Sequence, residues 1–425
     1  MFGNLCYIQT SLIEVILPCK INQLMKKKYI VVTIAFLLFP ITIKSQEIIV
    51  ISKSEILTKT SERNLSLKIS EYEFLKSKSD YLQTNAVYLP TITASHTGTS
   101  TTNPLMAFGS KLNQEILTAA DFNPTLLNNP VQTQNFSTKI EIQQPLINLD
   151  GFYERKAAKS KMEAMSLKAK RTQDYLVFEV EKAYMQLQLA YNAVHVLEKA
   201  QESANANKKM ADNSFNQGLL QRSDALSVEI QVIEVKNQLQ KAKRNVQNAS
   251  NYLSFLMNEE RDVVYKPTET LTVSIFNFED IKVSENRADI KAMQLASKGH
   301  EAMNKADKMA FMPRLNAFGS YEMYDNKLFQ GSVNGYLIGA QLSWSLFEGS
   351  KRFGKTQKSK AAFEQSKLEY KQYVSKSNLE LNKAKRQLID AKSQLELSSL
   401  SVKQSKESLR IRKNRFKEGL SLIHI

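Results

Sequence analysis

The sequence predicts a mixed α and β membrane protein in which a few amphipathic strands adjoin unusually long helices, in two tandem copies. Three observations lead to this fold class. The 67 residues 151–217 contain no proline and no internal glycine. Segments in which apolar and polar residues alternate precede this stretch, and the whole pattern recurs later in the chain. As one helix, this stretch would measure ~100 Å at ~1.5 Å per residue. We therefore expect an elongated molecule.

Composition narrows the class of protein. With 42% hydrophobic and 24% charged residues, the 425-residue chain should fold. Its formal net charge of +16 is compatible with nucleic acid or a membrane surface but identifies neither, and no nucleic-acid partner is predicted. Cys6 and Cys19 form no CxxC pair, which excludes a disulfide framework, a zinc ribbon and a thioredoxin-type site. The histidines include no pair at i, i+4 spacing, so neither a metal centre nor a cofactor is expected.

Residues 25–46 have the features of an export signal peptide. The basic segment Met25–Lys28 precedes an apolar run of eleven residues, Tyr29–Phe39, and a polar exit ends at Gln46. That run is shorter than the ~20 residues of a permanent membrane-spanning helix. Residues 1–24 precede this signal, and we expect them to be an over-long N-terminal extension.

The long proline-free stretch carries a heptad pattern. Apolar residues recur at alternating steps of three and four from Val180 to Leu197, and the pattern resumes from Ala225 to Leu256 after a turn at Gly218. Alanines at alternate positions of this seam allow close approach of the partner helices. The pattern predicts a long antiparallel helical hairpin.

The same pattern occurs twice. A shift of 201 residues places Val180 on Leu381 and the turn Phe215–Leu219 on Phe416–Leu420. Only six residues follow Gly419, whereas a helix of nearly forty follows Gly218, so the second hairpin is expected to be truncated. The predicted units are a first repeat at 47–256, a linker at 257–283 and a second repeat at 284–425.

Each repeat also contains two strand-like segments ahead of its long helix. Apolar and polar residues alternate in Ile92–Ser95 and Phe136–Ile142 of the first repeat, and in Leu315–Met323 and Tyr336–Phe347 of the second. Strands of ~10 residues with one apolar face suit a transmembrane β-barrel, but a single chain needs ~8 strands to close one. Since an open sheet edge in lipid leaves backbone groups unpaired, several chains must contribute strands.

Together these features resemble the TolC-like outer-membrane efflux proteins of Gram-negative bacteria, over roughly residues 47–420. Besides the duplication, the resemblance rests on short motifs in a fixed order: the strand starts Leu89–Pro90 and Met312–Pro313, the strand ends Gln144–Ile147 and Trp344–Phe347, and the two Phe-x-x-Gly-Leu turns. It implies a homotrimer whose chains each contribute four β-strands to a twelve-stranded outer-membrane β-barrel, continuous with a long periplasmic α-helical barrel.

The resemblance also implies a function and a set of site residues. The chain would be a non-enzymatic exit duct for efflux or type I secretion, set in outer-membrane lipid with a periplasmic extension. A periplasmic adaptor protein would couple it to an inner-membrane pump of RND, ABC or MFS type. Asp224, just past the first turn, is the gate candidate, although it could simply favour the N-terminal turn of its helix. The adaptor-contact candidates are Gly218, Leu219, Gly419 and Leu420.

Two alternatives come from the residues themselves. The string Gly349–Thr356 matches the phosphate-binding pattern GxxxxGK[ST] between a strand and a helix, but the preceding strand is amphipathic and no βαβ alternation surrounds it. The other alternative is a periplasmic coiled-coil adaptor or structural protein without a barrel. Such a protein would not need four amphipathic strands, nor the long polar loop Thr101–Gln134 at a strand tip.

Overall fold

The structure is a computed structural model that describes residues 47–259, 263–273 and 281–418. The predicted extension and signal peptide, and the contact candidates Gly419 and Leu420, lie outside these ranges. The elements, in chain order, are β1 (Glu47–Ile51), α2 (Lys53–Arg63), α3 (Leu65–Gln83), η1 (Thr84–Val87), β2 (Thr91–Thr101), α4 (Pro104–Asn113), η2 (Ala119–Phe122), α5 (Pro124–Asn128), β3 (Thr133–Ile147), α6 (Leu149–Asn216), α7 (Arg222–Met257), β4 (Val263–Pro267), α8 (Ala288–Met309), β5 (Arg314–Asp325), β6 (Val333–Ser343) and α9 (Lys351–Lys417).

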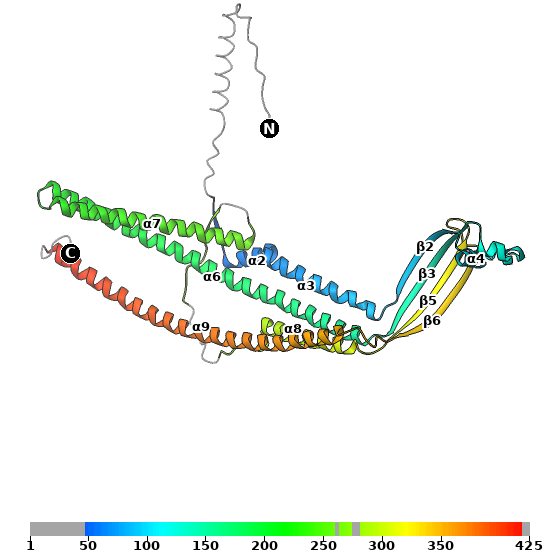
Figure 1. Ribbon diagram of the computed structural model, residues 1–425. Coiled ribbons are helices and arrows are strands. Elements are labelled where there is room, and N and C mark those ends of the chain that lie inside the picture. The colour runs from blue at the N-terminus through cyan, green and yellow to red at the C-terminus, as the bar shows by residue number, and fades with distance from the viewer. Residues whose placement is uncertain (1–46, 260–262, 274–280, 419–425) are drawn as a thin grey trace, which may run out of the picture.

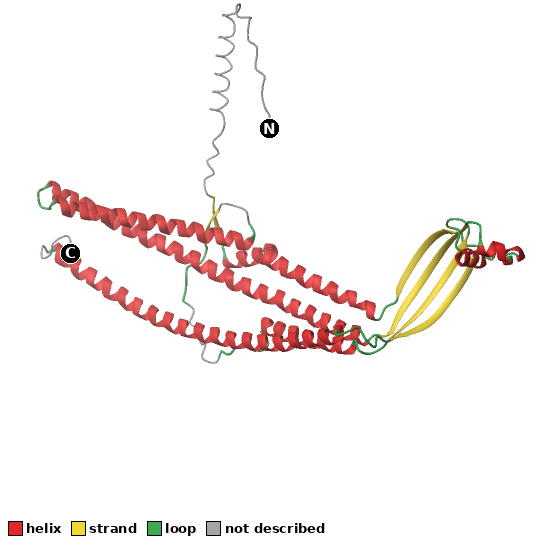
Figure 2. Ribbon diagram, viewed as in Figure 1, coloured by secondary structure: helices red, strands yellow, loops and turns green. Residues whose placement is uncertain are grey.

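The molecule is elongated, with a curved sheet at one end of a set of long helices (Figures 1 and 2). The sheet has four antiparallel strands in the order β2-β3-β5-β6, so each repeat contributes one neighbouring pair. The predicted fold class is confirmed. All four strands predicted from alternation are present, and the helices α6 and α9 that follow β3 and β6 have 68 and 67 residues.

The heptad seam packs as predicted. The side chain of Asn148 caps α6 by accepting a hydrogen bond from the Gly151 amide at 3.1 Å. From there α6 runs to the turn at Gly218, and α7 returns antiparallel along it (Figure 1). Seam residues of both helices are buried: Val180, Ala183, Leu187, Ala225, Leu239, Ala242, Val246 and Leu253.

The hydrophobic core lies midway along the helices and not beside the large sheet. Strands β1 and β4 pair in parallel and cover the α6–α7 hairpin, with Ile51 and Tyr265 fully buried. The backbone amide of Tyr265 donates to the Ser250 hydroxyl on α7 at 3.0 Å, and its own hydroxyl donates to Glu259 at 2.8 Å. The alternation pattern did not predict β1 or β4, and β4 lies inside the segment predicted to be a linker.

A buried carboxylate ties α9 to the rest of the helices. Asp289, near the start of α8, is 9% exposed. Its carboxylate accepts hydrogen bonds from Arg287 at 2.6 Å and from Tyr373 of α9 at 2.8 Å, and Arg171 of α6 lies 3.2 Å away. Beyond Ser377, which accepts a hydrogen bond from Arg287, α9 extends with its apolar residues largely exposed (Figure 1).

The structure corrects two expectations from the sequence. The segment Thr101–Gln134, expected to be a long polar loop, contains α4, η2 and α5, and Lys111 of α4 forms an ion pair with Asp121 at 2.7 Å. Asn103 and Asn123, each followed by proline, cap α4 and α5. The last predicted strand also ends early, at Ser343, and the next residue, Trp344, donates its indole N–H to the Phe311 carbonyl at 2.9 Å.

Among the described residues, no helix combines the length and the apolar character that a membrane crossing requires. The exposed apolar residues of α9 are interspersed with lysine, arginine and glutamate.

We predict that Asp289→Asn lowers the free energy of unfolding at neutral pH by about 1–3 kcal/mol, because it leaves Arg287 without its charged partner. Burial raises the pKa of Asp289, but hydrogen bonds from Arg287 and Tyr373 and the charges of Arg287 and Arg171 outweigh it, so its pKa is lowered from 3.8. The stabilisation is therefore complete above the unfolded-state pKa and is lost as pH falls through the lower folded-state value.

The measurement is thermal unfolding of the purified protein in detergent at pH 7 and at steps below pH 4. Glu301→Gln on the same helix is the control, since its ion pair with Lys305 is exposed and worth at most ~0.5 kcal/mol. Equal effects of the two substitutions at pH 7 would contradict this account of Asp289.

Candidate functional site

The turn between α6 and α7 ends the long hairpin in a defined conformation. Gly218 has a φ of +74°, which L-residues other than glycine rarely adopt. Its amide donates to the Phe215 carbonyl at 2.9 Å, and the Leu219 amide donates to the Ser214 carbonyl at 2.9 Å. This pair of bonds is the Schellman motif. It leaves the Leu219 side chain 77% exposed at the end of the molecule, so the predicted contact candidates Gly218 and Leu219 lie together at an accessible tip.

Asp224 lies in the first turn of α7, and its side chain is exposed. It lines a hollow of about 460 Å³ between the two helices of the hairpin, near the tip. Leu220, Ser227, Val228 and Gln231 line the same hollow from the turn and α7, and Asn207 and Ala211 from α6. The carboxylate thus stands beside the turn, where it also faces the positive end of the α7 dipole.

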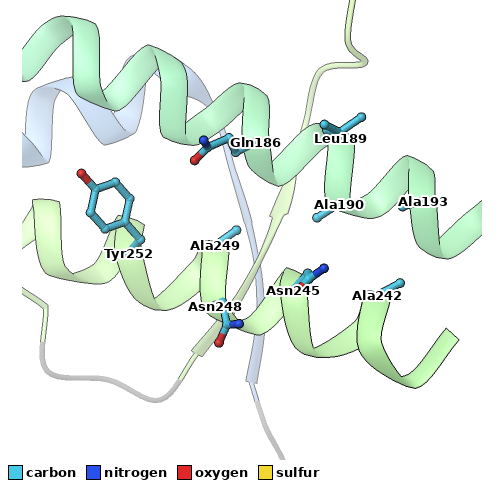
Figure 3. Close-up of a pocket in the computed structure, with 9 residues that line it drawn as sticks. All are labelled: Gln186, Leu189, Ala190, Ala193, Ala242, Asn245, Asn248, Ala249 and Tyr252. Atoms are coloured by element: carbon cyan, nitrogen blue, oxygen red, sulfur yellow. The ribbon is translucent and has the colours of Figure 1, made fainter. Parts of the chain in front are cut away.

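A second groove runs along the hairpin near its middle (Figure 3). It has a volume of about 480 Å³ and is lined by nine residues of α6 and α7, of which four are alanines and the others are Gln186, Leu189, Asn245, Asn248 and Tyr252. The small residues are Ala190, Ala193, Ala242 and Ala249. Such a surface lets another helix approach closely.

The four-stranded sheet has two chemically different faces, because side chains alternate along each strand. One face carries Ile92, Ile140, Ile142, Tyr321, Tyr336, Ile338 and Leu342, all more than a third exposed. The opposite face is mainly polar and carries Thr93, Ser95, Lys139, Glu141, Ser320, Glu322 and Tyr324, together with the apolar Phe318 and Leu337. Within the described residues β2 pairs only with β3, and β6 only with β5, so both outer strands have an edge open for pairing.

Charged groups fix the sheet to the helices. Arg314, the first residue of β5, forms a bidentate ion pair with Asp150 at the start of α6, which joins the two repeats. Arg155 donates to Thr84 at 3.0 Å and to the Tyr81 hydroxyl at 2.9 Å, and its guanidinium lies 4.4 Å from the Tyr81 ring centre. These contacts set the direction in which the strands leave the helices.

The nucleotide-binding alternative does not fit this geometry. The strand before Gly349 belongs to an antiparallel sheet, whereas the phosphate-binding loop follows a strand of a parallel one. Lys355 and Thr356, which would hold phosphate and magnesium, contact α8 instead. The Lys355 ammonium lies 2.9 Å from Asp307, and the Thr356 hydroxyl donates to the Asp307 carbonyl at 3.4 Å.

The sequence patterns did not identify the arginines at the junction between sheet and helices, nor the charged cluster on the sheet. The junction residues Arg155 and Arg314 are close in space to their partners but far from them in sequence. The charged residues Lys139 and Glu141 on β3 and Glu322 on β5 share one face of the sheet. Alternation within each strand could have identified that face as polar, but the strand register was needed to bring the three side chains together.

The sequence matches the family described as outer membrane efflux protein over residues 56–259 and 282–423. No curated protein matches it. Several solved structures share its fold. VceC of Vibrio cholerae is 14% identical, with a TM-score of 0.74 and 87% of each chain covered. CusC is 15% identical, with a TM-score of 0.73, and the match covers 87% of this chain and 83% of that one.

A third, the outer membrane channel CmeC of Campylobacter jejuni, is 18% identical, with a TM-score of 0.72, and the match covers 88% of this chain and 78% of that one. At these identities the structures establish a common fold. The family match covers most of the chain and both repeats. On this basis the chain belongs to the outer membrane efflux protein family.

Proposed function

We propose that the protein is a homotrimeric exit duct in the outer membrane, a passive conduit that carries out no catalysis. The observation that supports this most is the four-stranded sheet with an apolar face, a polar face and two open edges. Pairing β6 of one chain with β2 of the next satisfies both edges. Three chains then close a barrel of twelve strands, with the apolar face toward lipid and the polar face toward water.

The helices would continue this duct into the periplasm. Helix α6 spans ~100 Å at ~1.5 Å per residue, far more than the thickness of a bilayer. The alanine-lined groove of Figure 3 and the exposed apolar residues of α9 offer surfaces on which helices of neighbouring chains could pack. Packed side by side, three copies of these helices would enclose a tunnel below the barrel.

The duct would work with two partners. A periplasmic adaptor protein would dock at the hairpin tip, through Gly218 and Leu219 and through the matching residues Gly419 and Leu420 of the second repeat. An inner-membrane pump of RND, ABC or MFS type would supply the energy for efflux or type I secretion. Asp224, beside the tip, would act at the periplasmic entrance, by closing it or by favouring cations.

The alternative is a periplasmic coiled-coil adaptor or structural protein. The two-faced sheet argues against it, because an aqueous compartment gives no reason to expose isoleucine, tyrosine and leucine along four strands. Membrane fractionation tests the choice. Recovery in the detergent-extracted outer membrane, as trimers that resist mild heating on gels, is expected for the duct. A soluble periplasmic pool would favour the adaptor.

Gly218→Trp should leave trimers intact but reduce chemical cross-linking to the adaptor several-fold and raise drug sensitivity. The space around a side chain at this position is open, so the indole would project from the tip and obstruct docking. Gly218→Ala is the matched control, because it brings a similar strain of about 1 kcal/mol at positive φ without the bulk. Cross-linking that is undiminished by tryptophan would exclude this turn as the docking site.

Asp224→Asn should lower the ratio of cation to anion permeability in planar bilayers roughly two- to fivefold, the effect expected when one charge per chain is removed from a water-filled entrance. The recordings are made at ~0.01 M salt, where the Debye length is ~30 Å. If the substitution changes neither conductance nor ion preference, Asp224 has only its helix-dipole role.

A further inference from the structure

A mixed-charge cluster crosses two neighbouring strands on the polar face of the sheet. Lys139 of β3 stands directly opposite Glu322 of β5 in the strand register. The Lys139 ammonium lies 3.0 Å from a carboxylate oxygen of Glu141, two residues along the same strand, and 3.4 Å from a carboxylate oxygen of Glu322. The single Lys139 ammonium therefore forms an ion pair with each of the two carboxylates.

Neutral hydrogen-bond donors hold both carboxylates in place. The Tyr324 hydroxyl and the Ser320 hydroxyl donate to Glu322, the latter at 3.3 Å. The Gln143 amide donates to Glu141 at 3.0 Å. These donors add no charge, so two carboxylates and one ammonium leave one net negative charge per chain. The three charged side chains remain roughly a quarter to two-fifths exposed and can act on solutes.

The cluster lies far from the proposed entrance. Its strand β3 leads into α6, whose 68 residues span ~100 Å before the turn that precedes Asp224. That distance is about ten Debye lengths at 0.1 M salt, so the two sites act on ions independently. On the lipid face of a barrel, a lysine costs ~2–4 kcal/mol at the bilayer midplane and a glutamate less, so the three charges together favour a position of this face toward the lumen.

We propose that Lys139, Glu141 and Glu322 form an ion-discriminating ring inside the barrel, which favours cations over anions and in which Lys139 sets the strength of the preference. This inference rests on the proposed trimeric duct, in which three clusters surround one aqueous lumen. Each chain supplies one net negative charge. Removing a carboxylate brings the cluster to neutrality, whereas removing the ammonium doubles its net charge.

The experiment measures reversal potentials of the full-length protein in planar bilayers under a KCl gradient, with the dilute side at ~0.1 M, where the Debye length is ~10 Å. Glu322→Gln keeps the side-chain shape and an oxygen that can accept the Tyr324 hydrogen bond. It should lower the ratio of cation to anion permeability roughly two- to fivefold. Lys139→Gln should change the ratio in the opposite direction by a similar factor.

Glu62→Gln on α2 is the control for total charge, because the 19 residues of α3, ~28 Å of helix, separate α2 from the sheet. It should leave the ratio unchanged. Opposite shifts from the two cluster variants support the inference. If both cluster variants form conducting channels with an unchanged ratio of cation to anion permeability, while Asp224→Asn changes that ratio, the inference is wrong and the proposed duct is retained. If the unmodified protein forms no channels, both the proposed duct and the proposed ion-discriminating ring are wrong.

Discussion

The need to pair every backbone amide and carbonyl of the sheet governs the rest of the structure. Strands β3 and β5 are paired on both sides, whereas β2 and β6 each have one open edge within the described chain. In water such edges can be hydrated, but in hydrocarbon each unpaired group costs several kcal/mol. The apolar face formed by Ile140, Tyr336 and Ile338 suits lipid. Together, the open edges and the apolar face support the proposed duct, in which other copies of the chain complete the sheet.

The position of the hydrophobic core follows from these properties of the sheet. A sheet between lipid and water has no interior of its own, so the fully buried residues gather elsewhere, where β1, β4 and α2 cover the α6–α7 hairpin. Ile51 and Tyr265 are fully buried at the open end of the hairpin, where α7 ends, about midway along α6. Towards the sheet, Asp289 and the Asp150–Arg314 pair fasten one repeat to the other through buried or half-buried charges, which fix geometry more than they stabilise.

Much of this arrangement is predictable from local periodicity. Alternation identified all four strands of the sheet, heptads identified the hairpin and the buried positions Val180, Ala183 and Leu187, and the glycine placed the turn at Gly218. Features that depend on distant pairing were missed. The parallel partner of β1 is β4, more than two hundred residues away. Helices α4 and α5 were missed for another reason, because they are short and lie among asparagine, proline and threonine residues typical of loops. The lysine between Glu141 and Glu322 became visible only with the strand register.

The two candidate charge sites differ in how they are built, and the difference bears on what each can do. Asp224 is exposed on the hairpin tip. In the proposed duct, a docked partner would shift this tip and so change the effect of Asp224 on ions. Glu322 is held by Tyr324, Ser320 and Lys139 within a continuous sheet, where neighbouring strands leave little freedom to move. If both sites act as proposed, the sheet cluster would impose a constant ion preference, and a regulated step would belong to the tip.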